Sequence, residues 1–275
     1  RRATLRSIAA VAPRAWCMRA KLSFVLMSAI GEATTSAVAR AVADTTTSSV
    51  ARAVAGTVPW HERLDRSIGK SKKDRGANFV QIATVDRLGA PHCRTVVMRG
   101  FEAAAGEGGD VLRMVTDTRS DKICELIARP ECELVWWFGK SSEQYRISGR
   151  MELVADDPML LRSFTAEALA AAAPAPEQRE ALMAARKQQW GNLSDQSREQ
   201  WFMPTPGKPV GEEPVGNVPA GGRDVESGKV VEPPESFALL LLRPRRVDYL
   251  CLSGNLRQID LRSPECDWTG VIVVG

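Results

Sequence analysis

The sequence predicts an α+β fold whose core is an antiparallel β-barrel and whose helices lie at the periphery. Stretches rich in apolar and β-branched residues follow one another through short turns, as residues 78–85 and 93–98 do. Residues 143–154 alternate polar and apolar side chains with the two-residue period of a half-buried strand. The helix-forming stretches gather between residues 156 and 202. Antiparallel strands with segregated helices define the α+β class, and a long strand with one polar face indicates a barrel whose rim is a binding surface.

The predicted elements follow the chain in a simple order. A first helix starts near Pro59, with Leu64 and Ile68 on its inner face. Strands are predicted at 78–85, 93–98, 111–116, 131–138 and 143–154, with a helix from Ser120 to Pro130 between the third and the fourth. Helices are predicted at 159–172 and 177–190, followed by a short helix capped by Ser194. The final strands cover 237–242, 246–252 and 271–274, and Pro244 marks a bulge or an edge.

Length and composition bound the class of protein. The chain has 275 residues, of which 44% are hydrophobic and 25% charged, and this allows one large domain or two small ones. No run of 18 apolar residues occurs, so we expect no transmembrane helix. His61 and His92 have no partner at metal-ligand spacing, so we expect no metal site. The cysteines form no CxxC pair and are expected to be reduced, mostly buried thiols in an intracellular compartment; they are Cys17, Cys93, Cys124, Cys132, Cys251 and Cys266.

Residues 1–58 have the composition of a targeting leader. They hold eight basic and two acidic residues, a charge of +6, so residues 59–275 carry −2 of the overall +4. Arg, Ala, Ser and Thr dominate this leader, which is typical of an organellar transit peptide. Because the excess of basic residues is confined to it, we expect no nucleic-acid binding by the folded part.

The leader contains a tandem repeat of period 12, at 34–45 and 46–57, which is too short for a solenoid. The segment that starts at Met18 resembles a secretory signal with a short apolar core. Together the transit-peptide composition and this signal-like segment resemble the two-part leader of algae whose plastids lie inside extra membranes. We therefore expect a plastid location, with the mitochondrion or the cytosol as alternatives. Since the chain begins with Arg1 rather than Met, we expect its natural start to lie upstream.

The start of the helix predicted at Ser120 carries the first binding chemistry. A helix N-terminus presents free N–H groups and a partial positive charge, which suit an anion. Arg119 and Lys122 stand at this positive end, and Arg94 on a neighbouring strand offers a bidentate clamp. A bound phosphate is one interpretation of this arrangement. Solvated surface charges, or local neutralisation by Asp121, are the alternatives that these residues leave open.

A long irregular segment interrupts the folded part. Residues 203–236 hold seven prolines, and a loop of this kind is an active-site cover or a disordered segment. We expect disorder around residues 208–232. The chain is therefore divided into a disordered leader, residues 1–58, and one folded domain, residues 59–275, that contains this loop.

Several motifs occur together in the folded part. They are PW at 59–60, FVQIATVDRLGAPHCRTVVMRGF at 79–101, TDTRSDK at 116–122, EQYRISGRMEL at 143–153, W..LSDQSR…W at 190–201 with P.PG at 204–207, and ESFALLLLRPRRVDYL at 235–250. Through these motifs, from Pro59 to about Arg262, the chain resembles the pyridoxamine 5′-phosphate oxidase-like, FMN-binding split-barrel proteins. The similarity is greatest to the divergent subgroup of plants, algae and cyanobacteria. The resemblance implies a split β-barrel with peripheral helices and a homodimer that holds FMN between two barrels.

The resemblance also implies roles for individual residues. The cofactor-binding positions are Arg94, Thr95, Val96 and Val97 on the strand beside the flavin, Val115 and Thr116 at the flavin, Ser120 and Lys122 at its phosphate, and Gln144 on a later strand. The candidates for the substrate phosphate are Arg99, Arg198 and Arg257.

The chain departs from the family pattern at three places. Asp121 replaces the arginine of a Ser-Arg-Lys motif, and we expect Arg119 to supply that charge to the cofactor phosphate. Arg99 replaces the lysine that ends the basic strand, which keeps the charge and changes the geometry. The C-terminal motif Arg-Leu-His-Asp-Arg reads RQIDL from Arg257 to Leu261, so its histidine is absent.

Arg94 and Arg99 are five residues apart, so a regular strand directs them to opposite faces. Either a bulge intervenes or Arg99 serves a different site, and we favour the substrate phosphate. The sequence identifies no catalytic acid or base. His92 is interpreted as a strand residue, and Trp136 and Trp137 are interpreted as core residues.

The leading hypothesis is an FMN oxidoreductase that oxidises pyridoxamine or pyridoxine 5′-phosphate, with dioxygen reoxidising the flavin. Two alternatives stay open: an FMN-dependent reductase with a nicotinamide donor, and a non-enzymatic flavin-binding module. The expected partners are a small-molecule substrate, dioxygen and a second copy of the chain, without nucleic acid or membrane.

Overall fold

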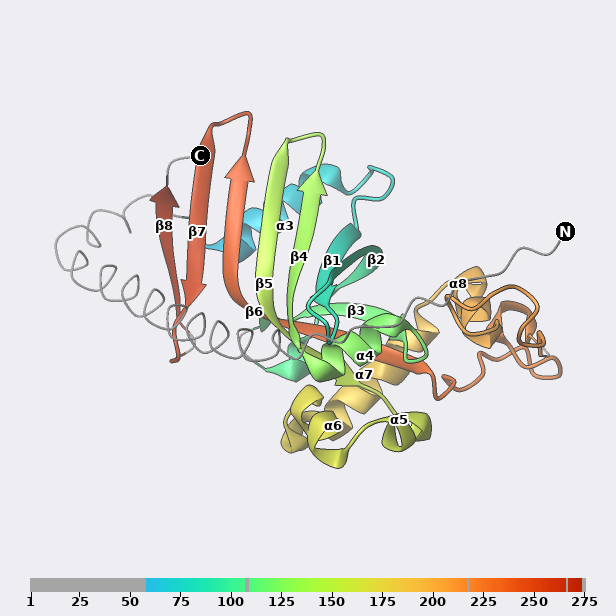
Figure 1. The fold of residues 1–275 in the computed structure, drawn as a ribbon. Coiled ribbons are helices and arrows are strands. Elements are labelled where there is room, and N and C mark those ends of the chain that lie inside the picture. Colours follow the sequence, from blue (N-terminus) through green and yellow to red (C-terminus); the bar gives the residue numbers. More distant parts are fainter. Residues whose placement is uncertain (1–57, 107–108, 217, 266, 274–275) are drawn as a thin grey trace, which may run out of the picture. The chain divides into compact units, whose positions relative to one another are not determined.

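Within the described residues, eight antiparallel strands form one sheet, and six of them close into a barrel (Figure 1). The computed structural model describes residues 58–273 except 107, 108, 217 and 266, so the predicted leader lies outside the described residues apart from Val58. The strands are β1 (Phe79–Val85), β2 (Pro91–Phe101), β3 (Leu112–Asp117), β4 (Glu131–Phe138), β5 (Glu143–Val154), β6 (Phe237–Cys251), β7 (Leu256–Arg262) and β8 (Trp268–Val273). Their order in the barrel is β3-β2-β1-β4-β5-β6, and β3 closes it by pairing with β6. The predicted α+β class with an antiparallel barrel is confirmed.

The helices pack around this barrel. They are α3 (Trp60–Ser71), α4 (Asp121–Ala128), α5 (Pro158–Ser163), α6 (Ala166–Ala172), α7 (Arg179–Gly191) and α8 (Asp195–Glu199), with short 3-10 turns η1 (Ala103–Ala105), η3 (Pro176–Gln178), η4 (Gln200–Phe202) and η5 (Ala220–Gly222). The single helix predicted at 159–172 is wrong, because α5 and α6 are separate. Thr165 caps α6 by accepting a hydrogen bond from the Ala168 N–H, so a new helix begins there.

Strand β6 is buried on both of its faces. Leu240 and Leu242 point into the barrel core, whereas Leu239 and Leu241 pack against Leu182 of α7 in a second apolar cluster. The sequence of a strand that is covered on both faces is an unbroken run of apolar residues rather than an alternation of polar and apolar ones. This explains the FALLLL sequence at the start of β6.

The two neighbouring tryptophans of β4 have different environments. Trp136 is 3% exposed and belongs to the core, as predicted. Trp137 is 43% exposed, so its assignment to the core is wrong. Successive side chains of a strand point to opposite faces, and only one face of β4 points into the barrel. The outward face therefore carries an exposed aromatic ring.

Strand β6 continues through Pro244 by means of a β-bulge. Ser148 of β5 pairs with Arg246 and Gly149 pairs with Pro244, which leaves Arg245 as the extra residue. A Cβ atom on Gly149 would lie 2.1 Å from the Arg243 carbonyl oxygen, so this close approach requires glycine. Of the two readings of Pro244, the bulge is the one that the structure shows.

The segment 203–236 is folded against α7 and α8, and the disorder expected around 208–232 is wrong for its described residues. Trp190 donates from Nε1 to the Val231 carbonyl oxygen at 2.7 Å. Lys187 forms an ion pair of 2.6 Å with Glu232. Backbone bridging between Arg223 and Val230 closes a small turn. The backbone groups of this segment find partners within the segment and on side chains of α7 and α8.

The described cysteines differ from the sequence expectation. Cys132 is buried, Cys93 and Cys124 are exposed, Cys251 is intermediate, and all four are free thiols. The prediction of mostly buried thiols is therefore wrong for this part of the chain. None of the described helices is long and apolar enough to cross a membrane. No group of three metal-ligating side chains occurs among the residues described.

Candidate cofactor site

A cavity of about 360 Å³ lies where β2, β3 and α4 meet the segment that follows α7. Its walls include six of the predicted cofactor-binding residues and one predicted substrate residue. The lining residues are Thr95, Val96, Val97, Arg99, Val115, Thr116, Asp117, Lys122, Ser197, Gln200, Trp201 and Pro206. Residues that are far apart in the sequence therefore form a single concave site, and such sites bind small molecules.

The alternation of β2 sets one wall of the cavity. Thr95, Val97 and Arg99 share one face of the strand, and all three line the cavity. The pairing of β2 with β3 shifts register between Met98 and Phe101, an interval that includes Arg99. Arg94 and Arg99 have separate environments, because Arg94 contacts Glu125 of α4 whereas Arg99 lines the cavity.

Lys122 supplies one positive charge to the cavity. Its Nζ donates to Thr116 Oγ1 at 3.2 Å and to Ser120 Oγ at 2.7 Å. Burial lowers the pKa of Lys122, and the positive charge of Arg94 lowers it further. Lys122 forms no ion pair with a carboxylate in the described part of the chain. An anion in the cavity would therefore compensate this charge.

Arg99 supplies a second positive charge. Its Nε atom is buried without a hydrogen-bond partner. Burial lowers the pKa of the Arg99 guanidinium, and no described carboxylate forms an ion pair with it. A buried donor without a partner costs free energy unless a ligand satisfies it. Two cations that form no ion pair among the described residues, with threonine hydroxyls beside them, fit a ligand that carries phosphate.

Asp121 does not neutralise this site through an ion pair. It is exposed at the start of α4, and it forms no ion pair with Arg119 or Lys122. Ser120 does not line the cavity. Its hydroxyl donates to the Asp117 carbonyl oxygen at 2.6 Å and accepts from Lys122, so Ser120 orients the lysine.

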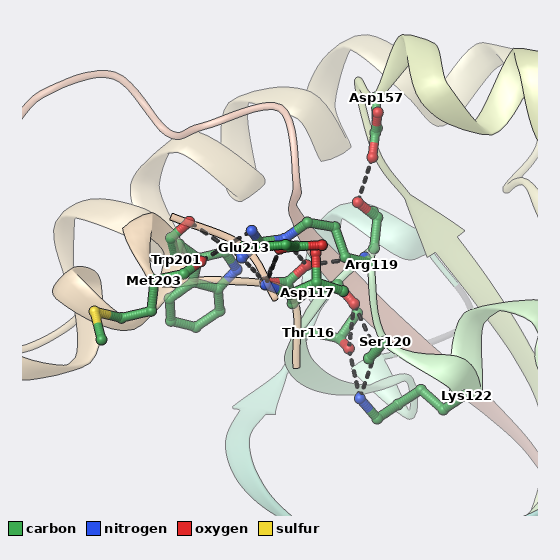
Figure 2. A network of polar contacts seen from close by, with 11 residues as sticks. Thr116, Asp117, Arg119, Ser120, Lys122, Asp157, Trp201, Met203 and Glu213 are labelled. Carbon is green, nitrogen blue, oxygen red and sulfur yellow. Dashed lines mark hydrogen bonds and ion pairs between the residues drawn. The ribbon is translucent and has the colours of Figure 1, made fainter. Parts of the chain in front are cut away.

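Arg119 lies outside the cavity wall, in the polar network of Figure 2. Its guanidinium forms an ion pair of 2.6 Å with Asp117. It also donates to the carbonyl oxygens of Met203 at 3.0 Å and Trp201 at 3.3 Å. Hydrogen bonding to Asp117 raises the pKa of Arg119. Arg119 therefore links Asp117, at the end of β3, to the backbone of Trp201 and Met203. This position differs from its predicted role at the cofactor phosphate.

Arg94 also lies outside the cavity wall. It forms an ion pair of 2.9 Å with Glu125 and donates to Thr84. His92, on the same strand as predicted, contacts the other oxygen of Glu125. Burial alone would raise the pKa of Glu125, but hydrogen bonds from Thr84, His92 and Arg94 lower it. Arg94 thus does not line the cavity, and its positive charge lowers the pKa of Lys122.

The predicted substrate residue Arg198 has a different environment. Its side chain is 2% exposed and forms an ion pair with Asp195. It donates from Nε to the Gly221 carbonyl oxygen at 2.9 Å and from Nη1 to that of Leu193. Every one of these partners is internal to the segment around α8. Arg198 therefore fixes this segment and does not line the cavity, so its role toward the substrate stays a prediction.

Gln144 and Arg257 lie on the outer face of the sheet, away from the cavity. Gln144 of β5 pairs with Leu250 of β6, and Leu250 pairs with Arg257 of β7, so these side chains share one face. Arg257 forms an ion pair of 2.9 Å with Asp248. A single copy of the chain therefore does not bring Gln144 or Arg257 to the cavity.

Besides Asp117, four lining residues were not predicted as site residues from the sequence. They are Ser197, Gln200, Trp201 and Pro206, from α8, η4 and the loop after them. All four lie within or beside the W..LSDQSR…W and P.PG motifs, from which only Arg198 was chosen. The motif as a whole indicated this part of the cavity wall, whereas Arg198, the residue chosen from it, contacts groups of its own segment.

Comparisons with known proteins agree with this geometry. A family model described as the FMN-binding domain of pyridoxamine 5′-phosphate oxidase matches residues 57–155. Pyridoxine/pyridoxamine 5′-phosphate oxidase 2 of Arabidopsis thaliana is 35% identical over 200 residues, which cover 73% of this chain and 86% of the relative. Pyridoxine/pyridoxamine 5′-phosphate oxidase of Microcystis aeruginosa is 32% identical over 100 residues, 36% of this chain and 43% of that protein.

A solved structure supports the same assignment. The pyridoxamine 5′-phosphate oxidase-related, FMN-binding protein of Nostoc punctiforme superimposes with a TM-score of 0.61 at 30% identity, covering 80% of this chain and 99% of that one. Fold, sequence and a cavity suited to a phosphate-bearing ligand agree. The chain belongs to the pyridoxamine 5′-phosphate oxidase-like, FMN-binding split-barrel family, and FMN is its cofactor.

Proposed function

We propose that this chain oxidises pyridoxamine or pyridoxine 5′-phosphate to pyridoxal 5′-phosphate, with dioxygen as the final electron acceptor. One observation carries the proposal: Arg99 and Lys122 line the same cavity, and neither forms an ion pair with a described carboxylate. A site for FMN and a phosphorylated substrate needs two separate cations for two phosphate groups. The names of the Arabidopsis and Microcystis relatives support this substrate class.

The two cations have different tasks in this proposal. Lys122, at the start of α4, holds the cofactor phosphate together with the Thr116 hydroxyl and the N–H groups of the helix start. Arg99, on β2, holds the substrate phosphate through its planar guanidinium. When bound, FMN supplies the two-electron acceptor for the substrate. The chain contributes orientation and charge. The one carboxylate among the described lining residues is Asp117, and Arg119 already forms hydrogen bonds with it.

We also propose that two copies of the chain combine to complete the site. The outer face of the sheet carries half-exposed apolar side chains, with Trp137 at 43%, Leu261 at 44% and Val271 at 44% exposure. Gln144 and Arg257 lie on this same face. Apolar surface gathered on one sheet face favours an interface. Pairing through it brings Gln144 and Arg257 of one copy toward the cofactor cavity of the other.

The experiment that tests the reaction is anaerobic mixing of the purified, FMN-loaded protein with pyridoxamine 5′-phosphate. Loss of the visible flavin absorption, followed by its return on admission of air, is the expected result. Loss of absorption only with NADH or NADPH would identify a reductase instead. No loss with either donor would identify a flavin-binding module. The absorption spectrum of the purified protein, with flavin bands in the visible, is the first control.

For the location, we propose that residues 1–58 direct the protein to a plastid. The proposal rests on the basic, acid-poor composition of this leader. Fusion of residues 1–58 to a fluorescent protein, expressed in algal cells, tests it. Fluorescence that coincides with chlorophyll is the expected result, and a mitochondrial or cytosolic pattern would overturn it.

A further inference from the structure

A second cavity, of about 340 Å³, lies at the bulge of β6, where the ends of β5 and β7 approach it. Four of its seven lining residues are arginines, and none is acidic. The lining residues are Arg150, Arg243, Pro244, Arg245, Arg262, Ser263 and Pro264. None of them belongs to the wall of the cofactor cavity.

The bulge creates this concentration of positive charge. The extra residue of β6, Arg245, has no partner on β5, so the alternation of the strand breaks between Arg243 and Arg246. Gly149 permits this arrangement, because any larger residue would collide with the Arg243 carbonyl oxygen. Bulges often re-aim side chains next to binding sites, and here the bulge presents an additional arginine at the cavity.

The arginines differ in how far other groups already engage them. Arg243 forms an ion pair of 2.7 Å with Glu152 and contributes mainly structure. Arg150 forms a longer ion pair, 3.7 Å, with Glu131, whose side chain is 63% exposed, and such pairs are weak. Arg245 is exposed and forms no ion pair with a carboxylate in the part of the chain that the structure describes. The cavity therefore has a surplus of positive charge.

The other side of the cavity is rigid. The Arg262 guanidinium lies 6.0 Å from the centre of the Trp268 ring, a cation–π geometry that orients it. Ser263 donates its backbone N–H to the Asp267 carbonyl oxygen at 2.8 Å, which closes the turn between β7 and β8. Pro264 lies in that turn and adds an apolar surface. A fixed wall of this kind reduces the entropy that ligand binding costs.

We propose that this second cavity binds a small phosphate monoester. Planar guanidinium groups match the oxygens of a phosphate, and Arg150, Arg245 and Arg262 surround one space. The cavity volume lies within the range of about 300–1,000 Å³ that is typical of small-molecule sites, so it has room for an organic group beside the phosphate. Pro244 and Pro264 provide apolar contacts for that group. The proposal does not depend on the reaction at the cofactor cavity.

The test is calorimetric titration of the FMN-saturated protein with phenyl phosphate. FMN saturation fills the cofactor cavity, and Arg99→Gln removes the proposed substrate-phosphate contact. We expect Arg99→Gln to retain the binding event at the bulge and Arg245→Gln to weaken it by about tenfold, the usual effect of losing one charge-assisted contact. Arg87→Gln, in the exposed turn between β1 and β2, makes the same charge change elsewhere and is expected to change the affinity by less than about twofold.

Three results would overturn the proposal. The first is equal affinity of the Arg245→Gln and Arg87→Gln proteins. The second is complete loss of phenyl phosphate binding in the Arg99→Gln protein, which would place the ligand in the cofactor cavity. The third is the absence of any binding up to about 10 mM ligand, or equal binding of uncharged phenol. These titrations measure binding and do not depend on oxidase activity. They can therefore be interpreted even if the reaction test with pyridoxamine 5′-phosphate fails.

Discussion

Asp117 and Arg119 form an ion pair of 2.6 Å. Asp117 lines the cavity, and Arg119 donates to the carbonyl oxygen of Met203 in the segment that follows α8. Through this pair, the end of β3 and the carbonyl oxygens of Trp201 and Met203 belong to one network (Figure 2). The shape of the cavity therefore depends on a contact between two parts of the chain more than 80 residues apart.

Replacement of Arg119 tests this dependence. Arg119→Met removes the ion pair and the two carbonyl contacts, so we expect the free energy of unfolding to fall by about 1–2 kcal/mol. Backbone hydrogen exchange at residues 201–203 is expected to accelerate, which mass spectrometry measures. Arg87→Met is the matched control, because Arg87 is exposed in a turn. Unchanged exchange at 201–203 in the Arg119→Met protein would contradict the role of the network.

Lys122 is expected to determine the affinity for FMN. Lys122→Met removes the charge at the start of α4, and we expect the dissociation constant for FMN to rise by about 10- to 100-fold. Lys122→Arg keeps the charge and should lose less than about tenfold. Quenching of free flavin fluorescence on titration with apoprotein measures both values. Equal affinities of the Met variant and the unchanged protein would refute the assignment of Lys122 to the cofactor phosphate.

Arg99 is expected to act on the substrate instead. In the Arg99→Gln protein we expect FMN affinity within about threefold of the original and a KM for pyridoxamine 5′-phosphate at least about tenfold higher. The reason is that Arg99 lies on the same cavity as Lys122 but on a different element, with its Nε free of protein partners. Simultaneous loss of flavin would show that both cations serve the cofactor.

The carboxylate Asp248 predicts a dependence of stability on pH. Burial alone would raise its pKa, but Arg257, Arg146 and Arg246 lower it to about 2. Because the folded-state pKa is depressed from 3.8, the stabilisation is present above about pH 4 and is lost as the pH falls toward 2. It amounts to about 2 kcal/mol.

Urea unfolding of Asp248→Asn between pH 2 and pH 7 measures this contribution. We expect the variant to be destabilised at neutral pH, where three arginines lose their shared counter-ion, and to lose less stability on acidification than the original protein. Asp74→Asn, an exposed position after α3, is the control. Parallel acid profiles for the Asp248→Asn and original proteins would rule out this carboxylate as the source.

The proposed assembly predicts the effect of a charge on the outer sheet face. Trp137→Glu places a carboxylate where two copies of the chain would meet, so we expect a dimer to become a monomer in sedimentation velocity. Leu88→Glu is the matched control, because Leu88 is 94% exposed in the turn after β1. A change of mass in both variants, or in neither, would argue against this face as the interface.

Sequence periodicity located most of the barrel. Strands β4 and β5 have the predicted bounds, 131–138 and 143–154, because alternation and turn residues act locally. The order of motifs also led to seven lining residues of the cavity, six predicted for the cofactor and Arg99 for the substrate. Strand β7 was quoted only as a motif, since its half-exposed sequence has no distinct pattern of its own.

The roles of the arginines could not be read from the sequence in the same way. Arg198 and Arg119 occupy motif positions, but tertiary partners such as Gly221 and Met203 decide where each guanidinium points. The guanidinium of an arginine can donate either to a ligand phosphate or to a carbonyl oxygen of its own chain. Distinguishing the two requires the distances, which only the folded chain provides.

The continuity of β6 has a mechanical consequence. Its first half pairs with β3 and β5 inside the barrel, and its second half pairs with β5 and β7 beyond the bulge. The closed barrel and the two-strand extension of β7 and β8 are thus joined by one strand, and the inserted residue Arg245 lies at the junction between them. We expect deletion of Arg245 to remove the bulge and to turn the side chains on one side of it to the opposite face of the sheet, because side chains alternate along a strand.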